Sequence, residues 1–221
     1  MIIPFIKNIN FFELAKFMSL QKKSILPKEY QQVEYLESTG TQYINTEWAY
    51  DIGMPVYLKP NYHIVCKCGS DDDYSIFGSK LAFNLTGLNG YYKFRGYSEY
   101  YTIDNTGIPV SLDPITWDFN NNTLTADGEY ITSFSSIAGS GGGRPIFLFA
   151  RSDGYNVDDM GGTVRIYHFK VSSNPFNNSD AITNIRDMYP CIRKSDNKPG
   201  MYDIITNQFF TNSGTGEFIT G

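Results

Sequence analysis

The sequence predicts an all-β protein built as a two-sheet sandwich of the jelly-roll type. Many short segments alternate apolar and polar residues, a pattern typical of strands that bury one face, and turn residues separate them at intervals of about 8–12 residues. The 17 Tyr and 16 Phe favour half-buried pleated surfaces. An N-terminal segment of different character is followed by about 190 of the 221 residues. This number of residues is larger than an immunoglobulin-type sandwich needs and fits a jelly roll better.

Composition excludes several classes of protein. The formal net charge is −5 and 19% of the residues are charged, so we expect no binding to nucleic acid through its phosphates. No segment approaches the ~20 apolar residues of a membrane helix, and we expect no membrane insertion. Three cysteines are too few for a disulfide scaffold. Cys66 and Cys68 are two residues apart, so they share a strand face and should pack as small apolar side chains.

Residues 1–28 are predicted to form an arm with a short helix, ahead of a sandwich at 29–221. Asn10 and Glu13 resemble a capping box, which marks the start of the helix. We expect mature sequence here rather than a signal peptide, because a basic start and a small-residue cleavage site are both missing. Four apolar residues recur at helical spacing: Phe11, Leu14, Ala15 and Met18.

The apolar face of this arm has two interpretations. The arm packs on its own sandwich, or it docks on another protein or on sister copies in a homo-oligomer. A helix of this length is marginal in water without a surface to lie on, and exposed apolar patches mark interfaces. We therefore predict that the arm binds a partner. The expected contact residues are Phe11, Phe12, Leu14, Phe17 and Met18.

Strands dominate the rest of the chain. Within them, Ile115, Trp117 and Phe119 fall on one face of a strand, and Asp127-Gly128 is the strongest hairpin signal in the sequence. Segments expected to form strands lie at 32–38, 41–46, 56–69 (interrupted at Pro60), 74–79, 80–85, 91–97, 114–121, 145–151 and 161–172, and a hairpin is expected at 122–134.

Three later segments carry distinct expectations. The run at 145–151 is continuously apolar, which favours one strand inside the sandwich. After the arm, only 179–189 has a helical pattern. The alternation and the Ser-Gly and Thr-Gly pairs of 200–221 predict a hairpin that belongs to the sheet, so the end of the chain is expected to be part of the fold.

The sequence resembles a known family at several blocks, in the same order, over about residues 26–221. LPKEYQQVEYLESTGTQYINT (26–46) is similar to the opening signature of concanavalin A-like, laminin-G-like jelly-roll domains of phage and gut-bacterial surface proteins. In that block the matching residues are Tyr30, Glu34, Tyr35, Glu37, Ser38, Thr39, Gly40, Thr41, Gln42, Tyr43 and Ile44. The middle blocks are Ile76–Ser79, Phe147–Arg151 and Val164–Val171. The terminal block matches at Pro190, Cys191, Arg193, Asp196, Gly200, Tyr202, Asp203, Phe209, Asn212, Gly214 and Gly216.

The resemblance implies a lectin-like sandwich in which the first and last segments pair. It also implies a non-enzymatic phage virion protein, in a fibre, tail or head decoration, that adheres to host or mucosal glycans. Such a protein would assemble in the host cytoplasm and bind virion structural proteins through the arm. The alternative is a bacterial surface carbohydrate-binding module or adhesin. A glycoside hydrolase is the third possibility.

The residues disfavour catalysis. Retaining glycosidases need two carboxylates about 5–5.5 Å apart, and we find no strand with the corresponding alternation of acidic residues. The two histidines, His63 and His168, are interpreted as strand residues, one facing in and the other out. We therefore expect no enzymatic activity.

We expect no cofactor, with calcium as the one alternative. Acidic turns can bind Ca²⁺ through carboxylates and backbone carbonyls, although solvated turns are the simpler interpretation. The expected metal ligands are Asp71, Asp72 and Asp73, and further acidic candidates are Asp153, Asp158 and Asp159.

Glycan binding requires aromatic faces that stack on sugars, beside polar groups that bond hydroxyls. The tyrosine-rich stretch 90–105 and a second candidate loop, 151–156, offer this mixture, although an ordinary sheet residue is the simpler interpretation of each tyrosine. The expected ligand-binding residues are Tyr91, Tyr92, Arg95, Tyr97, Tyr100, Arg151, Asp153, Tyr155 and Asn156.

Overall fold

A computed structural model describes most of the chain after the predicted arm. The described residues are 24–49, 60–68, 74–80, 83–95, 102–103, 106–110, 113–120, 123–133, 143–154, 156–160, 162–173 and 182–221. The helix and contact residues predicted in the arm lie outside them, as do Tyr97, Tyr100, Tyr155 and the acidic run Asp71–Asp73. In the described part of the chain, no helix is long and apolar enough to cross a membrane.

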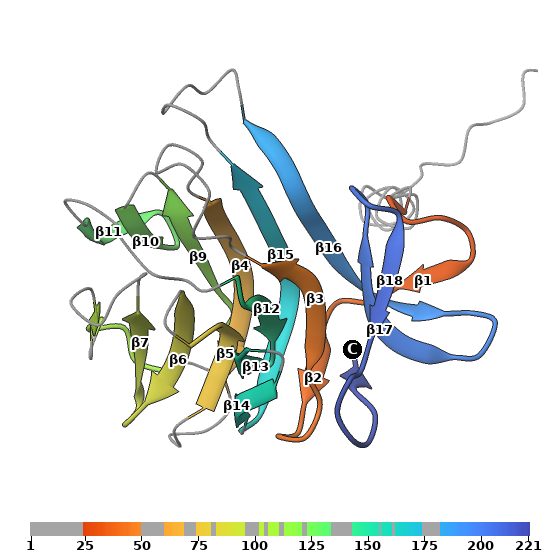
Figure 1. Cartoon of the computed structure of the whole chain (residues 1–221), viewed down its shortest axis with the longest axis horizontal. Helices are drawn as coiled ribbons and strands as arrows, with labels where there is room; N and C mark the ends of the chain where they lie inside the picture. Colours follow the sequence, from red (N-terminus) through yellow and green to blue (C-terminus); the bar gives the residue numbers. More distant parts are fainter. Residues whose placement is uncertain are drawn as a thin grey trace, which may run out of the picture.

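The described residues form an all-β sandwich of the jelly-roll type, as predicted (Figure 1). In the large sheet the strand order is β11 (Glu129–Ser133), β10 (Thr123–Ala126), β9 (Ile115–Asn120), β4 (Pro60–Cys68), β15 (Val164–Ser173), β16 (Thr183–Arg193), β17 (Lys198–Asp203) and β18 (Gln208–Thr211). Three further strands join this sheet: β1 (Tyr30–Gln32), β2 (Leu36–Ser38) and β19 (Ile219–Thr220).

The small sheet faces the large one, and a separate hairpin lies beside it. The order of the small sheet is β3 (Ile44–Ala49), β12 (Pro145–Leu148), β5 (Tyr74–Gly78), β6 (Asn84–Leu88), β7 (Tyr91–Arg95) and β8 (Thr102–Ile103). The hairpin pairs β13 (Ala150–Asp153) with β14 (Asn156–Met160).

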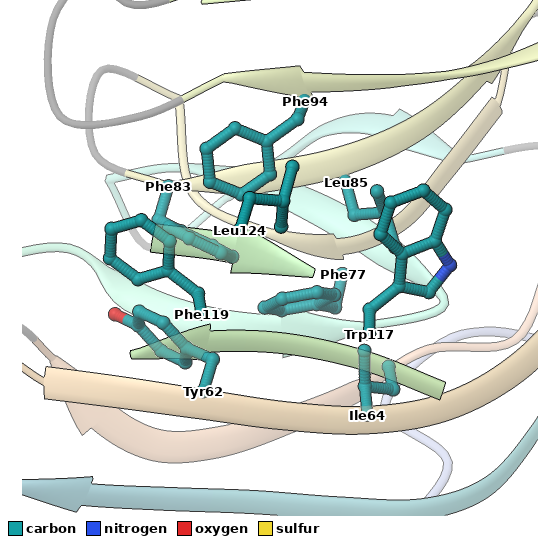
Figure 2. A pocket seen from close by; sticks show the side chains of 9 residues that line it. All are labelled: Tyr62, Ile64, Phe77, Phe83, Leu85, Phe94, Trp117, Phe119 and Leu124. Carbon is teal, nitrogen blue, oxygen red and sulfur yellow. The ribbon is translucent and has the colours of Figure 1, made fainter. Parts of the chain in front are cut away.

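Aromatic side chains from both sheets fill the space between them (Figure 2). Tyr62 on β4 stacks on Phe83, with ring centroids 4.2 Å apart, and Phe94 on β7 stacks on Phe119 of β9 at 5.5 Å. The space that these side chains leave is about 10 Å³, at most the size of one water molecule. The part of the interior that these described side chains enclose is therefore a closely packed core.

Several elements have the local structure that the sequence predicts. Ile115, Trp117 and Phe119 are all buried on the inner face of β9. Asp127 and Gly128 have φ angles of 49° and 82°, the left-handed backbone that a tight hairpin turn between β10 and β11 requires. Cys66 and Cys68 are buried in the core on one face of β4.

Two predicted elements were wrong. The described part of the helix predicted at 179–189 belongs to strand β16 from Thr183 onward, because β16 pairs with β15 on one side and β17 on the other, and these ladders outweigh local propensity. The predicted strand at 145–151 is divided: Phe149 has a φ of 64°, which turns the chain out of β12 and into β13.

Both ends of the described domain are held in the large sheet. Ile219 and Thr220 of β19 pair with Glu37 and Leu36 of β2, which confirms that the first and last segments pair. The predicted terminal hairpin is also present, as β17 and β18. Leu26, near the end of the predicted arm, is buried in a small cluster of apolar residues at the side of the sandwich.

Replacing Phe218 should test how far the fold depends on its last residues. The ring is buried and lies 4.7 Å from that of Phe149, so Phe218→Ala is expected to lower the free energy of unfolding by about 3–5 kcal/mol. The neighbouring Ile219 is 48% exposed, and Ile219→Ala should cost less than about 1 kcal/mol. Urea denaturation of both variants makes the comparison, and equal losses would show that the terminal segment is not part of the core.

The three thiols should be inert in the folded protein. Burial raises the pKa of Cys66 well above its usual value and raises those of Cys68 and Cys191 to about 12, so all three stay protonated at neutral pH. Iodoacetamide should label none of them under native conditions and all three in urea, as read by intact-mass spectrometry. Rapid labelling of the native protein would contradict this burial.

Candidate functional site

The outer face of β6 and β7 is polar. Asn84 lies opposite Arg95 in the ladder and Thr86 lies opposite Lys93, so the four side chains share one face. The alternate residues, Leu85, Tyr92 and Phe94, are buried in the core.

Tyr91 and Tyr92 therefore point in opposite directions. Leu88 lies opposite Tyr91, which is 40% exposed at the end of the polar face. Tyr92 has no exposed surface, and its ring lies 5.1 Å from that of Trp117. The expectation that Tyr92 binds a ligand was wrong, because successive residues of a strand point to opposite faces of the sheet and Tyr92 points into the core.

A groove of about 330 Å³ runs over this face, beside the β13–β14 hairpin. The hairpin lies against β5: the Lys80 amide donates to the Ser152 carbonyl at 2.7 Å, and Ser79 forms a β-bridge with Ser152. The hairpin thus contributes two charged side chains to the groove. The lining residues are Lys80, Asn84, Thr86, Leu88, Lys93, Arg95, Arg151 and Asp158.

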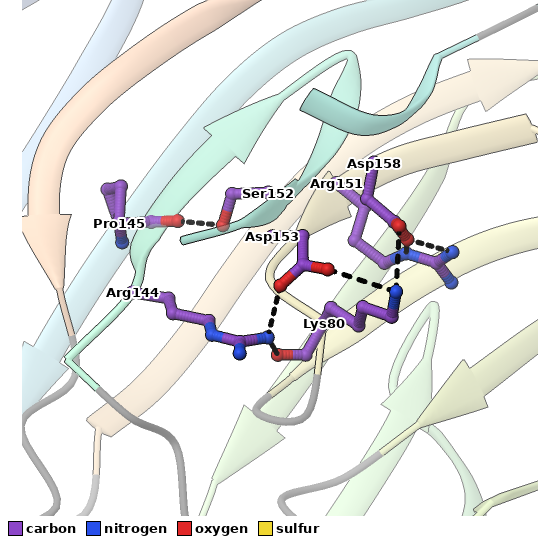
Figure 3. Close-up of polar contacts among 7 residues, drawn as sticks. All are labelled: Lys80, Arg144, Pro145, Arg151, Ser152, Asp153 and Asp158. Atoms are coloured by element: carbon purple, nitrogen blue, oxygen red, sulfur yellow. Dashed lines mark hydrogen bonds and ion pairs between the residues drawn. The ribbon is translucent and has the colours of Figure 1, made fainter. Parts of the chain in front are cut away.

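A chain of ion pairs joins the hairpin to the end of β5 (Figure 3). Arg144 contacts Asp153 at 2.7 Å, and Lys80 contacts both Asp153 at 3.0 Å and Asp158 at 2.9 Å. Arg151 donates to Asp158 through Nε at 2.9 Å and Nη2 at 2.5 Å. The alternation of charge fixes the positions of Lys80 and Arg151 at one side of the groove.

These ion pairs change the pKa values of two residues in the chain, Asp158 and Lys80. Burial works against ionisation of Asp158, but hydrogen bonds from Lys80 and Arg151 outweigh it and hold the pKa of that carboxyl below its usual value. The same carboxylate, followed by Asp153, raises the pKa of Lys80. Asp158 and Lys80 are therefore both ionised at neutral pH.

The structure brings some of the predicted ligand-binding residues together. Arg95 and Arg151 both line the groove, Tyr91 lies opposite the lining residue Leu88 in the ladder, and Asp153 forms an ion pair with the lining residue Lys80. Asn156 is exposed opposite Asp153 in the hairpin ladder, away from the lining residues. Six lining residues were not predicted as ligand-binding: Lys80, Asn84, Thr86, Leu88, Lys93 and Asp158, the last of which was considered only as a metal ligand.

The described residues do not assemble a metal centre. In this part of the chain, no group of three or more His, Cys, Asp or Glu side chains is placed to hold an ion. Asp153 and Asp158, considered as calcium ligands, are instead paired with lysine and arginine. The three main candidates, Asp71, Asp72 and Asp73, and the side chain of Asp159 lie outside the description.

A second polar hollow, of about 360 Å³, lies on the outer face of the large sheet. His63 contacts Asp118 at 2.7 Å, His168 contacts Asp187 at 2.7 Å, and the two imidazole rings are 5.1 Å apart. Burial opposes the ionisation of Asp187, but His168 and then Lys170 lower its pKa. These are two oriented histidine–aspartate pairs on a solvent-facing surface.

The expectation that one histidine faces in and the other out was wrong. A bulge between Ile166 and His168 shifts the register of β15 against β4. Ile166 and Phe169 remain buried, and His168 is placed on the outer face beside His63. A bulge of this kind leaves no simple signal in the sequence.

Comparison with known proteins shows a similarity in fold to a solved structure. No protein-family model and no curated protein sequence matches it. Its structure is similar to that of a Bacteroides ovatus protein described as a "putative carbohydrate binding protein", with a TM-score of 0.55 and 10% sequence identity. The match covers 86% of this chain and 60% of that protein. It agrees with the lectin-like sandwich implied by the sequence resemblance, and none of these comparisons supports a phage origin.

The network predicts a specific acid sensitivity. Because the pKa of Asp158 is lowered, its charge stabilises the fold above the usual carboxyl pKa, and this contribution is lost as the pH falls through the lowered value. Asp158→Asn should reduce the free energy of unfolding by about 1 kcal/mol at pH 7. The difference from wild type should narrow below about pH 4.

Urea denaturation at several pH values measures this difference. Glu217→Gln removes an exposed carboxylate elsewhere and serves as the control, with no change expected. An Asp158→Asn protein as stable as the wild type at pH 7 would contradict a stabilising network.

Proposed function

We propose that the chain is a non-enzymatic carbohydrate-binding module and that the groove over β6 and β7 is its binding site. The observation that carries this proposal is the meeting of a polar groove with an exposed tyrosine on one rigid sheet face. The volume of about 330 Å³ is at the lower end of the range of ligand sites, about 300–1,000 Å³.

The groove has the chemistry that sugars need. The Thr86 hydroxyl, the Asn84 amide and the Asp158 carboxylate can bond ring hydroxyls, as donors, acceptors or both. Tyr91 offers an aromatic ring on which the C–H face of a sugar can stack. Because these residues stand on strands and on a hairpin held by ion pairs, little ordering is needed on binding.

The fold neighbour supports a bacterial role. The Bacteroides ovatus protein favours a surface carbohydrate-binding module or adhesin over the virion protein that the sequence resemblance implied. We therefore propose action at a bacterial cell surface, with glycans as the partners. The match spans 60% of that protein, so its whole activity is not carried over to this chain.

A glycan array probed with the full chain tests the proposal, followed by calorimetry on the best ligand. Tyr91→Ala should weaken binding at least about tenfold, through loss of stacking worth about 1.4 kcal/mol. Tyr130→Ala is the matched control, because Tyr130 is 65% exposed but lies on β11 of the other sheet. Its affinity should equal that of wild type.

Two results would contradict the proposal. Binding that survives Tyr91→Ala unchanged, with a melting temperature equal to wild type, would remove the groove as the site. Release of reducing ends from the bound glycan would overturn the non-enzymatic assignment.

A further inference from the structure

We infer that the groove selects glycans that carry a negative charge, as a carboxylate or a sulfate ester on the sugar. This inference rests on the proposed carbohydrate-binding function and specifies the substrate class of the same site. The inference comes from the positive charge of the groove and from two hydrogen-bond donors that line it, Arg95 and Asn84.

The groove is cationic on an acidic protein. Four of its lining side chains are lysine or arginine and one is a carboxylate, whereas the chain as a whole has a net charge of −5. The cations come from separate elements and converge on one face: Lys80 follows β5, Lys93 and Arg95 stand on β7, and Arg151 stands on β13. Convergence of one sign of charge in a groove raises the local concentration of ligands of opposite sign.

Arg95 is the cation that a ligand can neutralise. Lys80 and Arg151 already contact Asp158, so much of their charge is compensated within the protein. Among the described residues Arg95 has no carboxylate partner, although its side chain is half-buried. A guanidinium presents a planar fork of donors that matches the oxygens of a carboxylate or sulfate.

Asn84 adds a second donor beside it. Asn84 lies directly opposite Arg95 in the ladder and is 2% exposed, and its Nδ2 has no hydrogen-bond partner in the described part of the chain. A buried donor without a partner is costly to the folded protein. An anionic group seated on Arg95 brings acceptor oxygens to both donors at once, whereas a neutral hydroxyl leaves the guanidinium charge uncompensated.

The experiment compares ligands that differ only in charge. Calorimetry with the full chain uses oligogalacturonate against its methyl ester, and a sulfated galactan oligosaccharide against its desulfated form. The charged member of at least one pair should bind about tenfold more tightly or better, and added salt should reduce that advantage. The two pairs distinguish a carboxylate from a sulfate ligand.

Arg95→Gln should abolish the advantage of the charged member. Lys198→Gln is the control, because it removes the same charge from an exposed position on β17, in the other sheet. Equal melting temperatures of the two variants and wild type verify the fold. An advantage that remains in Arg95→Gln overturns the assignment of Arg95.

The outcomes separate this inference from the function on which it rests. If charged and neutral sugars bind equally and both need Tyr91, charge selection is wrong and the carbohydrate-binding function stands. If no sugar binds, both are wrong. If inorganic polyphosphate or a single-stranded oligonucleotide binds through Arg95 more tightly than any glycan, the groove is an anion site of another class and the inference is overturned.

Discussion

The packing of aromatic side chains between the two sheets determines what the protein can present to solvent. Tyr62 and Phe119 from the large sheet meet Phe83 and Phe94 from the small-sheet side, with stacked pairs at 4.2 and 5.5 Å. Because side chains alternate along a strand, the inward direction of Phe94 forces its neighbours outward. The groove is therefore the reverse side of the core, and its register is as strongly specified as the core itself.

One backbone turn adds the wall of the groove. Phe149 has a φ of 64°, which a non-glycine residue adopts only at a cost of about 1 kcal/mol or more. Burial of its ring against Phe218 holds it there. The chain leaves β12 at this point and returns as the β13–β14 hairpin, which carries Arg151 and Asp158 to Lys80. Phe218, near the C-terminus, thus helps to hold the turn from which the β13–β14 hairpin reaches the groove.

Local patterns predicted the fold class because several strands alternate strictly between buried and more exposed residues, as β9 does with Ile115, Trp117 and Phe119 on its buried face. Local patterns gave the wrong secondary structure where pairing with strands distant in the sequence determines it. Strand β16 looks helical in isolation and is a strand because β15 and β17 flank it. The candidate site shows the same difference: Arg95 and Arg151 stand in stretches whose mixture of tyrosine and polar residues pointed to them, but only strand register places Asn84 beside Arg95. The error at Tyr92 was avoidable, since period two already separates it from Tyr91.

The net charge of the chain is a poor guide to what a ligand meets in the groove. Exposed charges interact over about 10 Å at ordinary ionic strength, so carboxylates elsewhere on the surface are screened from a ligand seated over β7. Within that range the alternating ion pairs leave Lys80 and Arg151 largely compensated and Arg95 without a carboxylate partner among the described residues. A negative net charge that disfavours nucleic acid is therefore compatible with a cationic groove for a small anionic ligand, because the first depends on the whole surface and the second on a few cross-strand neighbours.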